Sequence, residues 1–70
     1  MNYNDLLVTI HSVIDDKSKY SDVEREIVNY RVQGLDYKEI SDKTNCKIKK
    51  VDNTMTKFRR DLREVLGKDD

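Results

Sequence analysis

Two polar side chains in the C-terminal half of the sequence have the chemistry to recognise bases in duplex DNA. Lys49 and Asn53 are four residues apart, so on a helix they lie beside each other on one face. An asparagine amide can make two hydrogen bonds to adenine, and a lysine ammonium can donate to guanine. Thr56, on the same face, can contact a thymine methyl group or a phosphate. The spacing therefore predicts a helix face that contacts base edges.

Basic residues surround this face and predict contacts to the phosphate backbone. Residues 47–63 hold seven bases against two acids, whereas residues 1–36 hold four bases against seven acids. One segment is thus basic in a chain whose formal net charge is zero, a pattern typical of a helix that binds a polyanion. The predicted phosphate ligands, which set affinity rather than sequence preference, are Lys47, Lys50, Lys57 and Arg60, with Tyr37 and Lys38 on the preceding helix.

Asp52 is an acid within this basic segment. Its carboxylate can accept a hydrogen bond from cytosine N4, cap the helix or pair with a neighbouring basic side chain, or repel incorrect DNA sites. The sequence leaves these three roles open.

Four helical segments are expected to position these side chains. Apolar residues recur at helical spacing in residues 4–15, beginning with Tyr3 just before them. Ser21 with Glu24, and Asp36 with Glu39, have the spacing of capping boxes that begin helices over residues 22–33 and 37–43. The first of these helices is expected to stop at Gly34, and Asn45 is expected to adopt a positive φ in the turn that follows the second. The last helix is expected over residues 48–66, with a core-facing stripe of Ile48, Val51, Met55, Phe58, Leu62 and Val65.

A short helix, a tight turn and a longer basic helix form a helix-turn-helix arrangement. We expect Ile40, Ile48 and Val51 to fix the two helices at a steep angle, so that the second can enter a major groove about 12 Å wide. The predicted fold class is an all-α, four-helix, helix-turn-helix domain without winged elements, occupying residues 1–70 as a single domain.

The composition limits the classes of function. Seventy residues, of which 36% are hydrophobic and 40% charged, permit one small domain with a thin core. The single cysteine excludes an internal disulfide, and the chain shows neither a signal peptide nor an apolar run of membrane-spanning length, so we expect a cytoplasmic protein without a membrane partner. No nucleophile, acid–base pair or metal-ligand set has usable spacing, so we expect neither an enzyme nor a bound metal or cofactor.

The run SDVEREIVNYRVQGLDYKEISDKTNCKIKKVDNTMTKFRRDLREVL resembles region 4 of bacterial sigma-70-type factors, in particular the sigma-H branch. The resemblance covers roughly residues 20–66 and is carried by E-R-E-I-V, G-L-D-Y-K-E-I-S and V-D-N with the basic tail. It implies recognition of a promoter −35 element as double-stranded DNA during transcription initiation. On matching positions, it places base contacts at Ile48, Lys49, Asp52 and Asn53, and backbone contacts at Lys47 and Lys50.

The same resemblance implies RNA polymerase core as a partner, through the flap of its β subunit, and an anti-sigma factor as a further partner. Seventy residues leave no room for the region 2 of a full sigma factor. The sequence therefore predicts either an excised domain or a small free-standing homologue.

Two alternatives stay open. LuxR-type response-regulator domains share the E-R-E-I, G-x-x-x-K-E-I and V-x-N frame and would bind a palindrome as a dimer. The charged end of the last helix, with Arg59, Arg60 and Arg63, is a poor dimer face, so we expect a monomer. The second alternative is a protein-interaction module, such as a polymerase adaptor, that has kept the fold without binding DNA.

Overall fold

The structure of the chain is a computed structural model that describes residues 2–67. These residues form four helices and no strand: α1 (Tyr3–Ile14), α2 (Asp22–Val32), α3 (Tyr37–Thr44) and α4 (Ile48–Gly67). The prediction of an all-α helix-turn-helix fold is confirmed for the described residues. Each helix begins and ends within one residue of the position predicted from its caps and its apolar spacing.

Three of the four helices begin at a side chain that caps their free amides. Asn2 accepts from an amide in the first turn of α1, a cap that was not predicted from the sequence. Ser21 and Glu24 form both hydrogen bonds of the predicted capping box at α2, and Asp36 and Glu39 do the same at α3. These caps satisfy backbone donors that have no partner inside the helix, which fixes where each helix starts.

Left-handed backbone at two positions ends α2 and α3. Gly34 follows α2 with a φ of 102°, and Asn45 ends α3 with a φ of 56°. Glycine adopts this conformation without steric cost, and asparagine adopts it more readily than most other residues. Both stops were predicted from the sequence.

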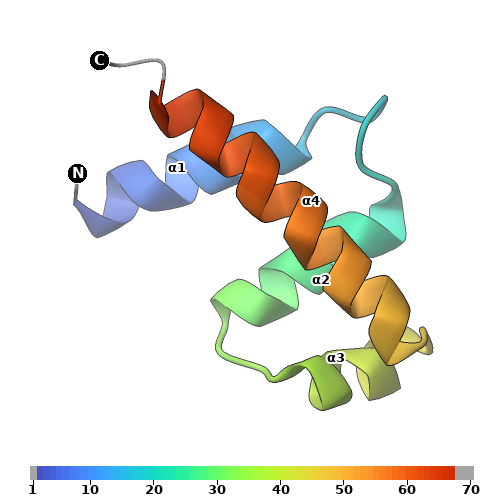
Figure 1. The fold of residues 1–70 in the computed structure, drawn as a ribbon. Helices are drawn as coiled ribbons and strands as arrows, with labels where there is room; N and C mark the ends of the chain where they lie inside the picture. The colour runs from blue at the N-terminus through green and yellow to red at the C-terminus, as the bar shows by residue number, and fades with distance from the viewer. Residues whose placement is uncertain (1, 68–70) are drawn as a thin grey trace.

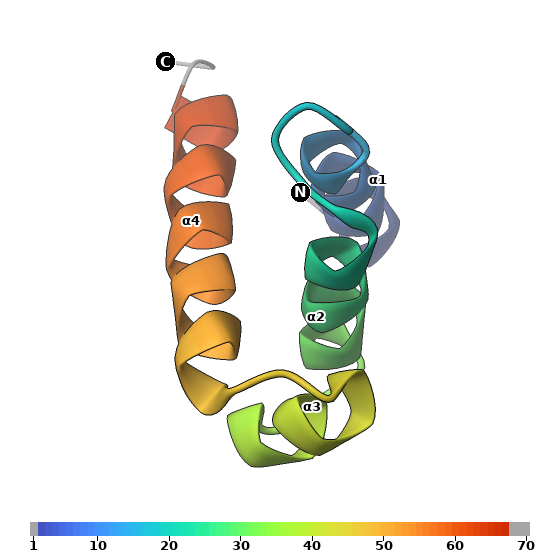
Figure 2. The same ribbon diagram turned by 90° about the vertical axis from the view of Figure 1, so that its right-hand side faces the viewer.

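The core lies between α4 and the other three helices. Figure 1 shows α4 crossing α1 and α2, with α3 beneath the start of α4, and Figure 2 shows α1 and α2 together on one side of α4. A single cluster of buried side chains from all four helices and the first loop fills this space: Ile10, Val13, Ile14, Tyr20, Ile27, Val28, Ile40, Val51, Met55 and Phe58. One face of α4 is therefore fixed against the body of the domain.

Tyr20 anchors the loop between α1 and α2. The sequence predicts a polar loop over residues 15–20 with Tyr20 at the edge of the core, and Tyr20 is almost fully buried. The Tyr20 hydroxyl donates to the Asp61 carboxylate at 2.7 Å. Burial, followed by this hydrogen bond, raises the pKa of Tyr20 well above its ordinary value. The loop is thus tied to the middle of α4 by an apolar ring and a polar contact at the ring's end.

Three residues near helix ends were predicted to be buried in the core but are exposed. Tyr3, Ile48 and Val65 keep 69%, 51% and 44% of their surface exposed, because they lie close to helix ends where fewer neighbours cover them. Ile48 therefore does not fix the angle between α3 and α4, whereas Ile40 and Val51 are fully buried there. The helical period predicts the direction of a side chain, but it does not predict how far the neighbouring helix extends.

Within residues 2–67, no helix is long and apolar enough to cross a membrane.

Candidate nucleic-acid interface

Hydrogen bonds of Ser41 and Thr44 close the turn between α3 and α4. The Ser41 carbonyl accepts from the amides of Asn45 and Cys46, and the Ser41 hydroxyl donates to the Cys46 carbonyl. The Thr44 hydroxyl donates to the Ile40 carbonyl at 2.7 Å. Since these contacts close the turn, α4 starts in a fixed direction relative to α3.

The N-terminal half of α4 exposes one polar face. Lys49, Asp52, Asn53 and Thr56 are exposed, whereas Val51, Thr54, Met55 and Phe58 on the other side of the helix are buried. Figure 2 shows that none of the other helices covers the side of α4 that faces away from α1 and α2. The structure therefore brings together the side chains that the sequence predicted as base contacts, with Ile48 exposed at the start of the same helix.

The start of α4 differs in charge and capping from the starts of the other helices. Its first turn holds no acid, and no capping side chain is present among the hydrogen bonds of the described residues. Lys47 is at the position where α1, α2 and α3 have Asn2, Ser21 and Asp36, and its carbonyl accepts from the amides of Lys50 and Val51. Exposed Lys47, Lys49 and Lys50 thus surround the positive end of a helix dipole, which makes this end strongly attractive to anions.

Lys57 is directed into the domain. Its ammonium donates to the Glu24 carboxylate at 2.7 Å and to the Lys19 carbonyl at 2.6 Å, and it lies 4.4 Å from the centroid of the Tyr20 ring. A lysine with three partners on its own chain is not available to a phosphate without breaking these contacts. We therefore leave Lys57 out of the candidate interface.

Lys50 and Arg60 are only partly engaged in ion pairs. The Lys50 ammonium lies 3.8 Å from the same Glu24 carboxylate, and its side chain is 46% exposed. Arg60 lies 3.6 Å from Asp61 and is exposed. Pairs of this length and exposure contribute little to stability. Both side chains remain accessible to a phosphate group.

Tyr37 contacts two arginines, and the sequence did not predict either contact. The Tyr37 hydroxyl accepts from Arg59 at 3.1 Å, and its ring lies 5.7 Å from the Arg31 guanidinium. The Arg59 guanidinium also donates to Thr56 at 3.4 Å. These residues come from three helices, so their proximity had no signal in the local sequence. Lys38, in the first turn of α3, is exposed.

Asp52 stays on the exposed face without an internal partner. Its carboxylate makes no ion pair and accepts no side-chain hydrogen bond within residues 2–67, and it lies beyond the first turn of α4. Of the three roles considered for Asp52, capping and local pairing are therefore not observed. Recognition of cytosine and exclusion of incorrect sites stay open.

Residues 1–69 match the family described as the N-terminal helix-turn-helix of vWA-MoxR associated proteins. The chain belongs to this family. The match supports a helix-turn-helix domain and does not support region 4 of a sigma-70-type factor, so the predicted subfamily is not retained. The LuxR-type alternative is likewise not favoured. No curated protein and no solved structure matches the chain.

The sigma factor resemblance has a structural explanation in this family of helix-turn-helix domains. The residues that carry it cap helices (Glu24, Asp36, Glu39), fill the core (Ile27, Ile40, Val51) or end a helix (Gly34). Such positions specify how three helices pack and turn, whichever DNA site or partner the domain has. The resemblance therefore predicted the fold correctly without defining the family.

Proposed function

We propose that this domain binds double-stranded DNA as a monomer, with the N-terminal half of α4 in the major groove. Lys49 and Asn53 contact base edges, and Ile48, Asp52 and Thr56 line the same surface. A major groove about 12 Å wide accepts an α-helix with its side chains. The uncovered face of α4 gives DNA access to these residues without any rearrangement of the core.

The observation that carries this proposal is the unfavourable start of α4. Cations at a helix N-terminus oppose the helix dipole, at a cost of about 0.3–1 kcal/mol each when exposed. Three lysines lie at or near this end of α4, where the other helices have a capping oxygen and acids. A bound polyanion would remove this repulsion, and the basic, uncapped start of α4 therefore supports a nucleic-acid ligand.

Phosphate contacts extend this surface on both sides of α4. Lys47, Lys50 and Arg60 are exposed on α4 and at its start, and Tyr37 and Lys38 lie at the start of α3. In helix-turn-helix complexes, contacts to the backbone position the second helix in the groove, and side chains on that helix supply sequence preference. We assign these five residues the positioning role.

The promoter −35 element, the polymerase β flap and the anti-sigma factor were implied by the sigma factor resemblance alone. The family match and the geometry of α4 give them no support. Our proposal is therefore sequence-specific DNA binding in the regulation of transcription, with no assigned promoter class.

Selection of bound duplexes from a randomised pool tests this proposal and identifies the recognised bases in the same experiment. The enriched duplex and a scrambled copy are then titrated with the protein, and fluorescence anisotropy is measured at several salt concentrations. We expect tighter binding to the enriched duplex, one protein per site, and an affinity that falls steeply with salt. Equal affinity for both duplexes would refute sequence-specific binding, and cooperative binding of two proteins to a palindrome would refute the monomer.

A further inference from the structure

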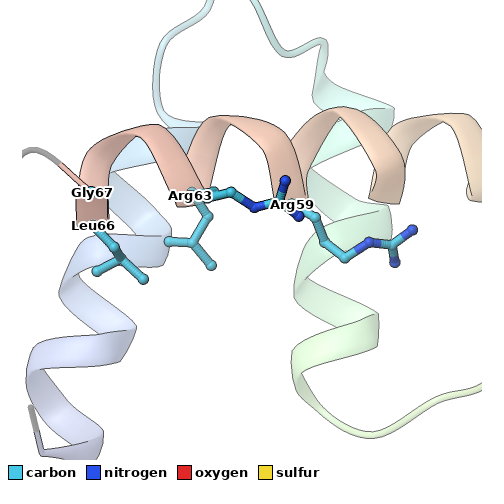
Figure 3. Close-up of a pocket in the computed structure, with 5 residues that line it drawn as sticks. Arg59, Arg63, Leu66 and Gly67 are labelled. Carbon is cyan, nitrogen blue, oxygen red and sulfur yellow. The ribbon is translucent and has the colours of Figure 1, made fainter.

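The C-terminal half of α4 carries a shallow groove that begins at Arg59, beyond the predicted base contacts. Its volume is about 460 Å³, and it is lined by Arg59, Leu62, Arg63, Leu66 and Gly67. Figure 3 shows that Arg59 and Leu66 project from the same side of α4, with Arg63 between them along the helix. At helical spacing, Leu62 and Leu66 lie beside each other one turn apart, and Arg59 and Arg63 lie beside them in the same way.

The leucines and the arginines offer two different kinds of contact to a ligand. Leu62 is half-buried against the core, and Leu66 keeps 37% of its surface exposed. No acid lines the groove, and Arg63 makes no ion pair within residues 2–67. Arg59 uses donors for Tyr37 and Thr56 and has further N–H groups left. The groove therefore combines an apolar surface with guanidinium groups that lack carboxylate partners.

We propose that this groove binds an acidic amphipathic helix of a partner protein. Such a helix places apolar side chains on Leu62 and Leu66 through one face, and its flanking carboxylates pair with Arg59 and Arg63. This is the helix-in-groove mode, in which apolar anchors one turn apart give affinity and charges set orientation. The charge complementarity selects an acidic helix over a neutral or basic one.

The groove and the candidate DNA interface lie on different parts of one helix. Asn53 and Leu66 are separated by about 20 Å along α4, at 1.5 Å per residue. A partner in the groove therefore leaves Lys49 and Asn53 accessible to DNA, and the two surfaces meet only at Arg59, which donates to Tyr37 and Thr56. The proposal does not depend on DNA binding, and either can fail while the other holds.

A pair of synthetic peptides tests the charge preference. The first is a labelled 16-residue helical peptide with leucines spaced by three and four residues and glutamates on the flanks. The second has lysine at every glutamate position. We expect the glutamate peptide to bind the wild-type chain about tenfold more tightly than the lysine peptide at low salt, because two ion pairs replace two repulsions. Equal binding of the two peptides would overturn the proposal.

Variants of the full chain locate the binding site. Arg63→Glu and Leu66→Glu are expected to weaken glutamate-peptide binding at least fivefold, a difference resolved by anisotropy. Lys17→Glu reverses a charge on the first loop, and Val65→Glu changes an exposed apolar residue outside the groove lining; both are expected to bind the peptide as the wild type does. Circular dichroism confirms that each variant is folded. Loss of binding in the controls, or none in the groove variants, would refute the assigned site.

Other occupants of the groove give different results. Self-association of the wild-type chain in sedimentation, removed by Leu66→Glu, would show that a second copy occupies it. A marked gain in peptide affinity in the double variant Asp69→Asn, Asp70→Asn would show that the chain's own acidic end competes for the arginines. Either result would overturn the proposal of an external partner.

Discussion

The Lys57 ammonium lies 2.7 Å from the Glu24 carboxylate and joins the middle of α4 to the first turn of α2. The second oxygen of this carboxylate accepts from the Ser21 amide at 3.0 Å, so Glu24 closes a capping box and holds α4 with one side chain. Both partners are partly buried. One lysine of α4 thus orients the helix, while Lys49 on the other side remains free for a ligand.

The Glu24 contacts predict a loss of stability in acid. Burial alone would raise the pKa of Glu24, but the hydrogen bonds from Lys57 and the Ser21 amide, with the charges of Lys57 and Lys50, lower it below its ordinary value. A carboxyl with a lowered pKa in the folded state stabilises the fold above its unfolded-state pKa. We therefore expect the contribution of Glu24 to the free energy of unfolding to be complete above about pH 4.5. It should decrease as the pH falls below that value and be lost once the pH is below the folded-state pKa of Glu24.

Chemical denaturation of Glu24→Gln and Glu26→Gln across this pH range measures that contribution. Glu26 is an exposed acid on the same helix and serves as the matched control. We expect Glu24→Gln to lose about 1–2 kcal/mol at neutral pH and to show a weaker pH dependence than the wild type. Identical acid profiles for the wild type and Glu24→Gln would contradict this account.

Lys47→Ser is expected to stabilise the free domain and to weaken DNA binding. Serine at the position before α4 can cap the free amides of the first turn, which contributes about 0.5–2 kcal/mol. In a domain of this size, each kcal/mol raises Tm by about 4–8 °C. Since the substitution also removes a cation from the interface, affinity for duplex DNA is expected to fall by a similar factor for all sequences.

Thermal denaturation and anisotropy titrations measure both effects on one sample. Lys17→Ser removes the same charge from the exposed loop between α1 and α2, and we expect neither measurement to change much. A Lys47→Ser variant with unchanged Tm and unchanged DNA affinity would show that the uncapped basic start of α4 has no functional role.

Substitutions on the exposed face of α4 are expected to separate base contacts from phosphate contacts. Asn53→Ala and Lys49→Ala each remove a predicted base contact, and each is expected to cost about 1–3 kcal/mol on the selected duplex and to relax sequence preference. Lys50→Ala is expected to weaken binding to selected and scrambled duplexes alike and to reduce the salt dependence. If all three variants weakened both duplexes equally, the face would bind phosphate without recognising bases.

Thr54 provides a test of packing beneath the interface. Its hydroxyl is buried and has no hydrogen-bond partner within the described residues. Thr54→Val keeps the shape and removes the uncompensated polar group, so we expect the free energy of unfolding to rise by about 1 kcal/mol. Thr44→Val, which loses a hydrogen bond to the Ile40 carbonyl, is expected to lower it by about 0.5–1.5 kcal/mol. Urea denaturation measures the free energy of unfolding of both variants. A change of the same sign in the two variants would contradict this account.

The helices were predictable because their start and stop signals are local. Ser21 and Asp36 are each followed three residues later by the glutamate that completes a capping box, and asparagine, as at Asn45, is a favourable residue for left-handed backbone. Burial was less predictable, because it depends on neighbours that are distant in sequence. The apolar period included Ile48, which is exposed, and omitted Thr54, which lies in the core.

The exposed polar face of α4 was predictable because helical spacing alone places Lys49 and Asn53 together. The directions of long side chains were not predictable in this way. Lys57 reaches Glu24, Lys19 and Tyr20 because the folded chain brings α2 and the first loop beside it. Tyr37 meets Arg59 and Arg31 for the same reason, since their contacts join three helices.

Chemical-shift mapping tests the central claim most directly. The ¹⁵N-labelled chain is titrated with the selected duplex, and backbone amide shifts are followed residue by residue. We predict that the largest changes fall within residues 47–56 and the start of α3, and that they diminish as salt is added. Changes confined to α1 or to the C-terminal half of α4, or no saturable change with any duplex, would contradict the proposal that α4 binds DNA through its N-terminal half.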